Sequence, residues 1–288
     1  MSAKVISVTN QKGGVGKTVT VSTMAAILTS QGHKVLAIDL DPQRNLDMSA
    51  GPNALIEVND TKTKSILHVM RDECTLREAI FPSEIGDLVR ASSLLSQWTG
   101  RPLVTLQELY EIPADKLHKL MMSRAEKGWG QTDSYVLSEK LEEVKDDYDY
   151  ILMDTNPSLM ALTVNSLCAS DYVLVPAIAE RISLEAVKEL WDTIQNLNHF
   201  NRWHKIRIAG ILLTRYKANT VIARDYRRQM EKLAKMMGTV VFNTTIRDSI
   251  SVSEYTAEEK NLYEYDPDNN VTQDYLNFVE EFVARINP

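Results

Sequence analysis

A segment near the start of the chain combines the residue types that bind phosphate groups. It reads Lys12-Gly13-Gly14-Val15-Gly16-Lys17-Thr18 and is followed by Val19. Glycines let a backbone bend and approach an anion closely, and the N-terminus of a following helix directs N–H groups and a positive dipole end at it. Lys17 would contact the outer phosphates of a nucleotide, and the Thr18 hydroxyl would bind Mg2+. The segment therefore predicts a phosphate-binding loop over residues 12–19.

The loop departs from the general phosphate-loop pattern at its start. The general pattern has a glycine five residues before Gly16, where this chain has Gln11 and then a second lysine, Lys12. A glycine turn with two solvated lysines is the alternative interpretation. The order of an apolar run at 5–8, the glycines and a helical pattern at about 18–30 favours the phosphate loop.

Acidic residues end two apolar runs further along the chain. Asp39 and Asp41 follow the run 35–38, and Asp154 follows the run 150–153. Ligands of open α/β sheets bind at the carboxyl ends of the strands, so we expect these carboxylates beside the loop. Asp154 is a candidate for the Mg2+ shell, which it could reach through water or Thr18, and Asp39 and Asp41 are candidates for Mg2+ and for positioning an attacking water. The alternatives are that Asp41-Pro42 only starts a turn and that Asp154 is one of many acids at strand ends.

Composition limits the class of protein. The 288 residues are 44% hydrophobic and 25% charged, which is ordinary for a globular protein. Two cysteines, Cys74 and Cys168, supply neither a disulfide framework nor a four-ligand zinc or iron–sulfur site within one chain, and fit a cytoplasmic location. No apolar run approaches the roughly 20 residues of a membrane span, and no signal peptide is expected. The net charge of −7 means that nucleic-acid binding must be argued locally.

Strand and helix patterns alternate along the chain. This alternation predicts an α/β fold with a doubly wound, mainly parallel sheet and helices on both faces. We expect one domain over 1–288, with a less regular insertion at about 100–135. The expected strands are 5–8, 35–40, 85–91, 150–154, 172–176, 206–214 and 239–242. The expected helices are 18–30, 65–70, 76–81, 138–145, 159–169, 183–197, 220–237 and 271–286.

The segment 202–238 is strongly basic in an acidic chain. It holds ten lysines and arginines against two acids, Asp225 and Glu231. On a helix over 220–237, the periodicity predicts a buried stripe and an opposite cationic face. The predicted stripe is Ile222, Tyr226, Met230, Leu233 and Met237. The candidate DNA-binding residues are Lys217, Arg224, Arg227, Arg228 and Lys235. Cations along one face can follow phosphates without reading base sequence, although an ordinary solvated face is the alternative.

Taken together, these motifs resemble the ParA/Soj family of partition ATPases, within the wider group that includes MinD. The loop with its additional Lys12 resembles the signature loop of that family, and 39–43 resembles its first switch segment. Residues 148–159 resemble its Walker B strand and second switch, and Glu254 with 263–267 resembles a late family segment. The resemblance covers most of the chain and is weakest at about 100–135.

The resemblance implies a dimer that forms on ATP binding and separates after hydrolysis to ADP and phosphate. Lys12 would reach the partner's phosphates, Lys17 would hold the β- and γ-phosphates, and Asp41 would position water. Thr18 would bind Mg2+ directly, with Asp154 behind it and Asp39 nearby. The dimer would bind DNA nonspecifically, associate with the nucleoid in the cytoplasm and respond to a ParB-like centromere-binding partner, without a membrane contact.

Two departures and several alternatives accompany the resemblance. Thr155-Asn156-Pro157 replaces the usual proline pair, and 244–249 lacks the proline and asparagine that often close over adenine. A MinD-like membrane protein would need a basic amphipathic C-terminal helix, whereas 274–288 is acidic. An iron-protein-like reductase would need paired cysteines, and a metabolic kinase or ligase would need an acceptor site. A relative that positions protein cargo instead of DNA remains an alternative function.

Overall fold

A computed structural model describes residues 2–51, 63–98, 133–157, 161–200, 205–249, 252, 258 and 260–287. Its centre is one seven-stranded sheet with the order β3-β4-β2-β5-β1-β6-β7, in which only the β3–β4 pair is antiparallel. The predicted doubly wound, mainly parallel sheet is therefore confirmed. The strands are β1 Lys4–Val8, β2 Val35–Leu40, β3 Ile80–Ser83, β4 Gly86–Val89, β5 Tyr150–Thr155, β6 Tyr172–Ile178 and β7 Arg207–Thr214.

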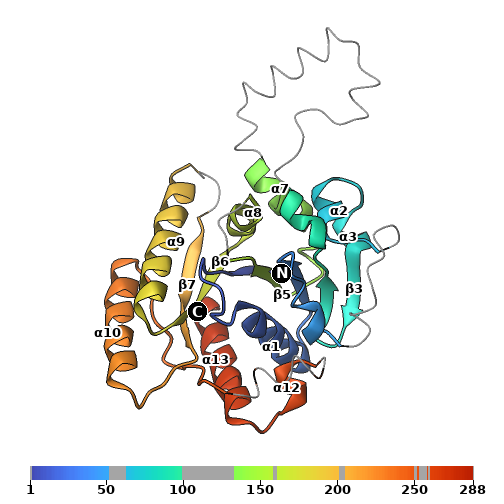
Figure 1. Ribbon diagram of the computed structural model, residues 1–288. Coiled ribbons are helices and arrows are strands. Elements are labelled where there is room, and N and C mark those ends of the chain that lie inside the picture. The colour runs from blue at the N-terminus through green and yellow to red at the C-terminus, as the bar shows by residue number, and fades with distance from the viewer. Residues whose placement is uncertain are drawn as a thin grey trace.

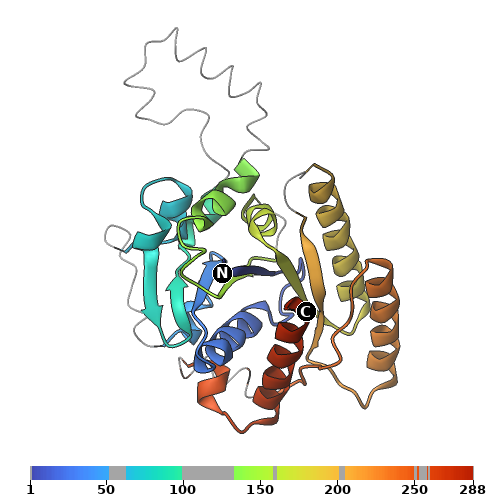
Figure 2. The same ribbon diagram turned by 180° about the vertical axis from the view of Figure 1, so that it is seen from behind.

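Helices cover both faces of this sheet (Figures 1 and 2). On one face lie α1, α12 and α13, which pack against β1, β2 and β5. On the other lie α2, α3, α7, α8 and α9, while α10 packs beside α9 and β7. Their bounds are α1 Lys17–Ser30, α2 Ile66–Met70, α3 Leu76–Ala79, α7 Val136–Leu141, α8 Ala161–Ala169, α9 Arg181–Phe200, α10 Val221–Met236, α12 Leu262–Tyr265 and α13 Asn270–Ile286.

The near-continuous apolar runs are strands that are buried on both faces. Along β5, Ile151 and Met153 face α2 and α7, whereas Leu152 between them faces α1 and α13. Each apolar side chain of such a strand removes surface from water, which stabilises the fold by about 1.5–3 kcal/mol for a fully buried Val, Leu or Ile. Parallel sheets covered by helices have this pattern, which explains why runs without alternation mark the central strands.

Helix α1 begins inside the phosphate loop and ends at a glycine. Gly32 has φ +88°, and the N–H groups of Gly32 and His33 donate to the carbonyls of Thr29 and Leu28. These two bonds are a Schellman motif, which confirms Gly32 as the residue after the helix cap. Eleven of the 14 residues of α1 are buried, because the helix lies between the sheet and α12 and α13. The phosphate loop is thus joined to a helix that is anchored in the core.

The structure corrects three of the predicted elements. The predicted helix 138–145 is α7 Val136–Leu141, and residues 142–145 form turns. Only residues 76–79 of the predicted helix 76–81 are helical, because the chain turns into β3 at Ile80 and pairs with β4. The predicted strand 239–242 is not a strand: it contacts β7 through one isolated bridge, Ile211 to Val241. Phe242 lies so close to Gly210 that a Cβ there would be 2.4 Å from the ring. The Phe242 ring packs over Gly210 and against Phe278 and Phe282 of α13, while the backbone pairs with β7 only around Ile211.

The predicted insertion at 100–135 lies almost wholly outside the described residues, as does Glu254. In the part of the chain that the structure describes, every helix is too short or too polar to cross a bilayer.

Candidate functional site

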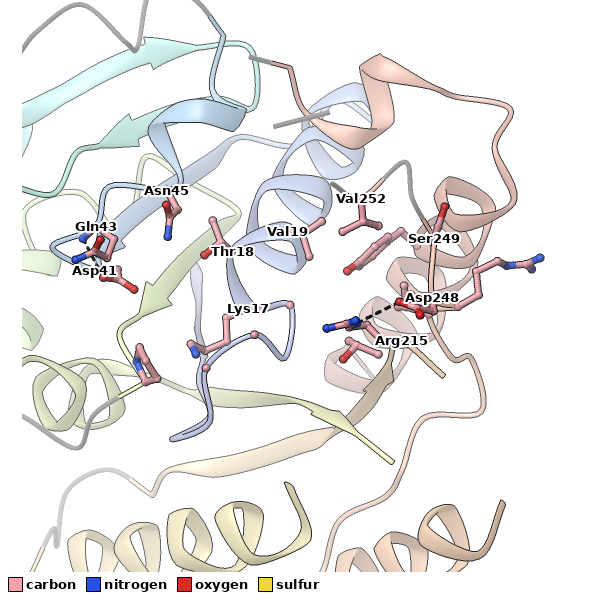
Figure 3. Close-up of a pocket in the computed structure, with 18 of the residues that line it drawn as sticks. Lys17, Thr18, Val19, Asp41, Gln43, Asn45, Arg215, Asp248, Ser249 and Val252 are labelled. Atoms are coloured by element: carbon pink, nitrogen blue, oxygen red, sulfur yellow. Dashed lines mark hydrogen bonds and ion pairs between the residues drawn. The ribbon is translucent and has the colours of Figure 1, made fainter. Parts of the chain in front are cut away.

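A cavity of about 570 Å³ opens at the carboxyl edge of the sheet, beside the phosphate loop. Pockets of 300–1,000 Å³ accept ligands of the size of a nucleotide. Figure 3 shows Lys17 and Thr18 between two walls, with Asp41, Gln43 and Asn45 on one side and Arg215, Asp248, Ser249 and Val252 on the other. Of the predicted loop residues, the cavity is lined by Gly13, Gly14, Gly16, Lys17, Thr18 and Val19.

The loop takes a shape that needs glycine at two positions. Gly14 and Gly16 have φ of +73° and +82°, in the left-handed region that other residues rarely adopt. The Thr214 hydroxyl donates to the carbonyl of the fully buried Val15 at 2.8 Å, which ties the loop to the end of β7. The Lys17 ammonium donates to the Lys12 carbonyl at 3.2 Å. The loop is therefore already curved around the space that a phosphate chain would fill.

Lys12 does not line this cavity. Its ammonium group forms an ion pair with the Glu180 carboxylate, which lies in the turn between β6 and α9. The structure thus separates the two lysines of the loop, with Lys17 inside the cavity and Lys12 outside it.

Asp154 lies beneath the loop and is fully buried. Neither of its carboxylate oxygens has a hydrogen-bond partner within the described residues. Burial raises the pKa of Asp154 to about 7; the nearby Thr18 hydroxyl and Lys17 ammonium oppose this rise, but neither makes a well-aligned bond to the carboxylate. An orphaned, buried carboxylate beside a threonine hydroxyl fits Mg2+, which takes few protein ligands and keeps waters and phosphates for the rest. No group of three or more acidic, His or Cys residues that could hold a metal ion occurs in the described ranges.

Asp39 occupies the neighbouring strand at the same level, since Asp39 and Asp154 are register partners of β2 and β5. Its oxygens are already used: Oδ1 accepts from the Asp41 N–H at 2.8 Å, and Oδ2 from the Leu46 N–H at 3.3 Å. Burial and the Asp154 carboxylate raise the pKa of Asp39 well above its ordinary value. The geometry therefore gives Asp39 a role in holding the loop 41–46, and leaves Asp154 as the acid with open oxygens.

Asp41 faces the cavity from this loop. Its Oδ1 accepts from the Gln43 N–H at 3.0 Å and from the Asn156 amide at 3.4 Å. Asn156 follows β5 and lines the same cavity with Pro157. The Asp41 carboxylate is thereby held in one orientation by the two loops that follow β2 and β5.

The far wall of the cavity comes from Arg215, the segment 246–249 and Val252. Arg215 has φ +50°, and its Nε lies 3.1 Å from Asp248. Arg247 forms two side-chain bonds with Asp274 of α13, at 2.7 and 2.8 Å, which fix the segment 246–249 against that helix. The missed lining residues are Gln43, Asn45, Asn156, Pro157, Thr214, Arg215, Ile246, Arg247, Asp248, Ser249, Val252 and Tyr275. Gln43, Asn156, Pro157 and 246–249 lie in segments that match or depart from the family pattern, and Arg215 directly follows a strand, so these positions carried a sequence signal.

Comparison with known proteins agrees with this site. A family model described as an AAA domain matches residues 3–206. The sporulation initiation inhibitor protein Soj of Bacillus subtilis is 32% identical over 284 residues, covering 98% of both chains. The chromosome-partitioning ATPase Soj of Thermus thermophilus is 30% identical, covering 98% of this chain and 96% of the relative. The chain belongs to the Soj/ParA family of partition ATPases.

The fold of this ParA-family chain is also found among solved structures. A plasmid partition protein of Borrelia burgdorferi bound to AMPPNP superposes with a TM-score of 0.70 at 24% identity, covering 98% of this chain and 99% of that one. At this identity the likeness concerns the fold, which is that of a P-loop ATPase. The predicted family and fold class are therefore confirmed.

Helix α10 carries most of the predicted cationic face. Arg224, Arg228 and Lys235 are exposed, and none of the three forms an ion pair with any described residue. Arg227 differs, since its Nε lies 2.9 Å from Glu231 and its guanidinium lies over the Tyr216 ring. Lys217 lies 3.3 Å from Asp248. Of the five predicted residues, Arg224, Arg228 and Lys235 are therefore exposed without an ion pair among the described residues, whereas Arg227 and Lys217 are paired.

The buried stripe of α10 is also shifted from the prediction. Ile222 is wrong as a core residue, because it is 70% exposed at the start of the helix. The first turn faces an open hollow of about 350 Å³ beside Glu180 instead of the body of α9. The residues buried against α9 and β7 are Ala223, Met230 and Ala234, with Tyr226, Leu233 and Met237 partly buried.

The raised pKa of Asp154 predicts a pH-dependent stability of the nucleotide-free chain. The unfolded carboxyl ionises near 3.8 and the folded one near 7, so between these values the unfolded chain releases a proton that the folded chain retains. Stability should therefore fall as the pH rises from about 4 to 7. Asp154→Asn removes this slope and should raise the free energy of unfolding at pH 8 by up to roughly 4 kcal/mol. Denaturant unfolding from pH 5 to 8 checks this, and equal slopes in both proteins would contradict it.

Proposed function

We propose that this chain is an ATP-dependent, dimerising partition ATPase that binds DNA nonspecifically and acts with a ParB-like centromere-binding partner. The observation that carries the proposal is the buried Asp154 with two unpartnered oxygens, beneath a preformed phosphate loop whose Lys17 enters the cavity. Such an arrangement suits the triphosphate and divalent cation of a P-loop enzyme, ATP/ADP with Mg2+.

In this proposal the loop residues bind and orient the phosphate chain. The backbone N–H groups of 13–19 and the start of α1 face the phosphates, and Lys17 contacts the β- and γ-phosphates. Mg2+, when bound, neutralises the charge that develops on the phosphate oxygens. Thr18 would hold it directly and Asp154 from behind. Burial lowers the pKa of Lys17, and the nearby Asp154 and Asp41 carboxylates partly oppose this shift.

Asp41 is the proposed residue that positions the attacking water. Its carboxylate is fixed by Gln43 and Asn156 at the cavity wall, so it can hold a water in line with the γ-phosphate without a large rearrangement. Hydrolysis then yields ADP and phosphate. Because Asn156 belongs to the loop after β5 and Asp41 to the loop after β2, both loops would respond to the loss of the γ-phosphate.

Lys12 makes the proposed enzyme depend on a second copy. Its side chain lies outside the cavity of its own chain and pairs with Glu180. The Lys12 ammonium can therefore bind a phosphate only after it separates from the Glu180 carboxylate. We propose that it contacts the phosphates of the partner subunit, so that ATP joins the two copies and hydrolysis separates them. DNA would then bind along the exposed cations of α10 in the dimer, which places the protein in the cytoplasm on the nucleoid.

Static light scattering tests this proposal. With ATP and Mg2+ the mass should double, and with ADP it should not. Lys17→Ala and Lys12→Ala should each weaken the dimer by about tenfold or more, because charge-assisted contacts to a phosphate are lost. Lys188→Ala on the exposed side of α9 is the matched control and should dimerise as the wild type does. A monomer at all ATP concentrations would refute the proposed dimer.

A further inference from the structure

The ion pair between Lys12 and Glu180 is formed within one chain. The Lys12 side chain is 20% exposed and the Glu180 side chain 40% exposed. The pair lies at the rim of the carboxyl edge, where the hollow beside α10 is lined by Glu180, Arg215 and Lys217. Lys12 is therefore engaged by a carboxylate of its own chain.

Both ends of this pair are held by the backbone. The Lys12 N–H donates to Asn10 Oδ1 at 3.0 Å, and the Asn10 amide donates to the Pro176 carbonyl of β6 at 2.7 Å. Glu180 lies two residues after the end of β6 at Ile178. Its N–H donates to the Ile178 carbonyl at 2.8 Å, and its carbonyl accepts from the Leu184 N–H at 3.2 Å. The two side chains are thus presented to each other by fixed segments of the same edge.

The Lys12 ammonium lies in an unfavourable environment, and Glu180 is the carboxylate with which it pairs there. Burial and the nearby Arg215 both lower the pKa of Lys12. Without an adjacent carboxylate, an ammonium close to a guanidinium is repelled toward solvent. A partly exposed ion pair is weak, so the Lys12 ammonium can leave Glu180 for another anion. A phosphate chain carries several negative charges and binds the same ammonium more strongly.

We propose that Glu180 is an intramolecular latch, which holds Lys12 in the monomer and must release it before the lysine can contact the phosphates of a second copy. The proposal rests on the proposed ATP-dependent dimer and adds its regulation. Because each dimer uses two lysines, two latches open for every dimer formed. The latch therefore raises the protein concentration that is needed for dimers to form with ATP. Glu180 acts through Lys12 and is a positioning residue.

The Glu180→Gln variant tests the latch through dimerisation. It removes the negative charge with little change in shape. The affinity of each released Lys12 for the partner's phosphates should then rise roughly threefold, which is within the range of partly exposed ion pairs. For two lysines, the dimer dissociation constant with ATP and Mg2+ should fall by about tenfold. Glu185→Gln is the matched control, because Glu185 pairs with Arg181 on the same helix and not with Lys12. An unchanged dissociation constant in Glu180→Gln would overturn the proposal.

Amine labelling of the nucleotide-free monomer tests the contact itself. Acetylation of Lys12, followed by mass spectrometry with the exposed Lys188 as internal reference, should be about threefold faster in Glu180→Gln than in the wild type. Glu185→Gln should label at the wild-type rate. Equal rates in all three proteins would overturn the latch.

The two readouts separate failure of the latch from failure of the proposed function. If labelling accelerates and the dimer also tightens, the latch is supported. If labelling accelerates while a normal ATP-dependent dimer does not tighten, Glu180 contacts Lys12 without gating it, and the proposal is wrong. If no protein dimerises with ATP although labelling accelerates, the proposed dimer fails and the gating role fails with it.

Discussion

Asp41→Ala should bind ATP but hydrolyse it at least about 100-fold more slowly than the wild type, because the group that positions the water is removed. The substitution leaves Lys17, Thr18 and Asp154 in place, so nucleotide affinity should change little. The variant should therefore remain dimeric with ATP long after the wild type has returned to monomers. Steady-state phosphate release and equilibrium binding of a fluorescent ATP analogue measure the two quantities separately.

The control for this variant is Asp192→Ala, which removes an exposed carboxylate of α9 far from the cavity. It should turn over ATP at the wild-type rate. Wild-type turnover in Asp41→Ala would exclude the water-positioning role, whereas lost ATP binding would show that Asp41 mainly maintains the loop 41–46.

Reversing the open cations of α10 should weaken DNA binding about a thousandfold at low salt. The triple change Arg224→Glu, Arg228→Glu and Lys235→Glu replaces three phosphate contacts with three repulsions. The slope of log affinity against log salt should also fall by about 3 in magnitude, since fewer counterions are released. Fluorescence anisotropy with a nonspecific duplex at several salt concentrations measures both.

A charge-matched control tests whether the change in net charge alone accounts for the loss of DNA affinity. Lys34, Lys64 and Arg71 are exposed near β2 and α2, at the opposite end of the sheet from α10, and their change to Glu alters the net charge equally. That control should retain most of the affinity. If both triple variants lose binding equally, the α10 face has no special role, and if the α10 variant binds normally, its cations form only a solvated surface.

Local sequence patterns were sufficient for the central sheet and for the phosphate loop. The short, unbroken apolar runs of β2 and β5 are typical of strands buried on both faces, and each is closed by acids that lie beside the phosphate loop. Gly14 and Gly16 predict a backbone turn without any tertiary information, because their positive φ is a local property.

Features that depend on distant partners could not be predicted in the same way. Ile222 has helical spacing typical of a core, but only the position of α9 shows that the first turn of α10 is uncovered. Phe242 has strand propensity, yet Gly210 leaves room for its ring to pack against Phe278 and Phe282 of α13. The pairs Lys12–Glu180 and Asp41–Asn156 join loops more than 100 residues apart, which spacing along the chain does not encode.

The central claim is that ATP converts this chain into a dimer that holds DNA. Its most direct test is binding of the wild-type protein to a nonspecific duplex at moderate salt, measured with ATP and Mg2+, with ADP and Mg2+, and without nucleotide. The account predicts binding with ATP that is at least about tenfold tighter than in the other two conditions, because two cationic α10 faces act together only in the dimer. Equal affinity in all three conditions would contradict it.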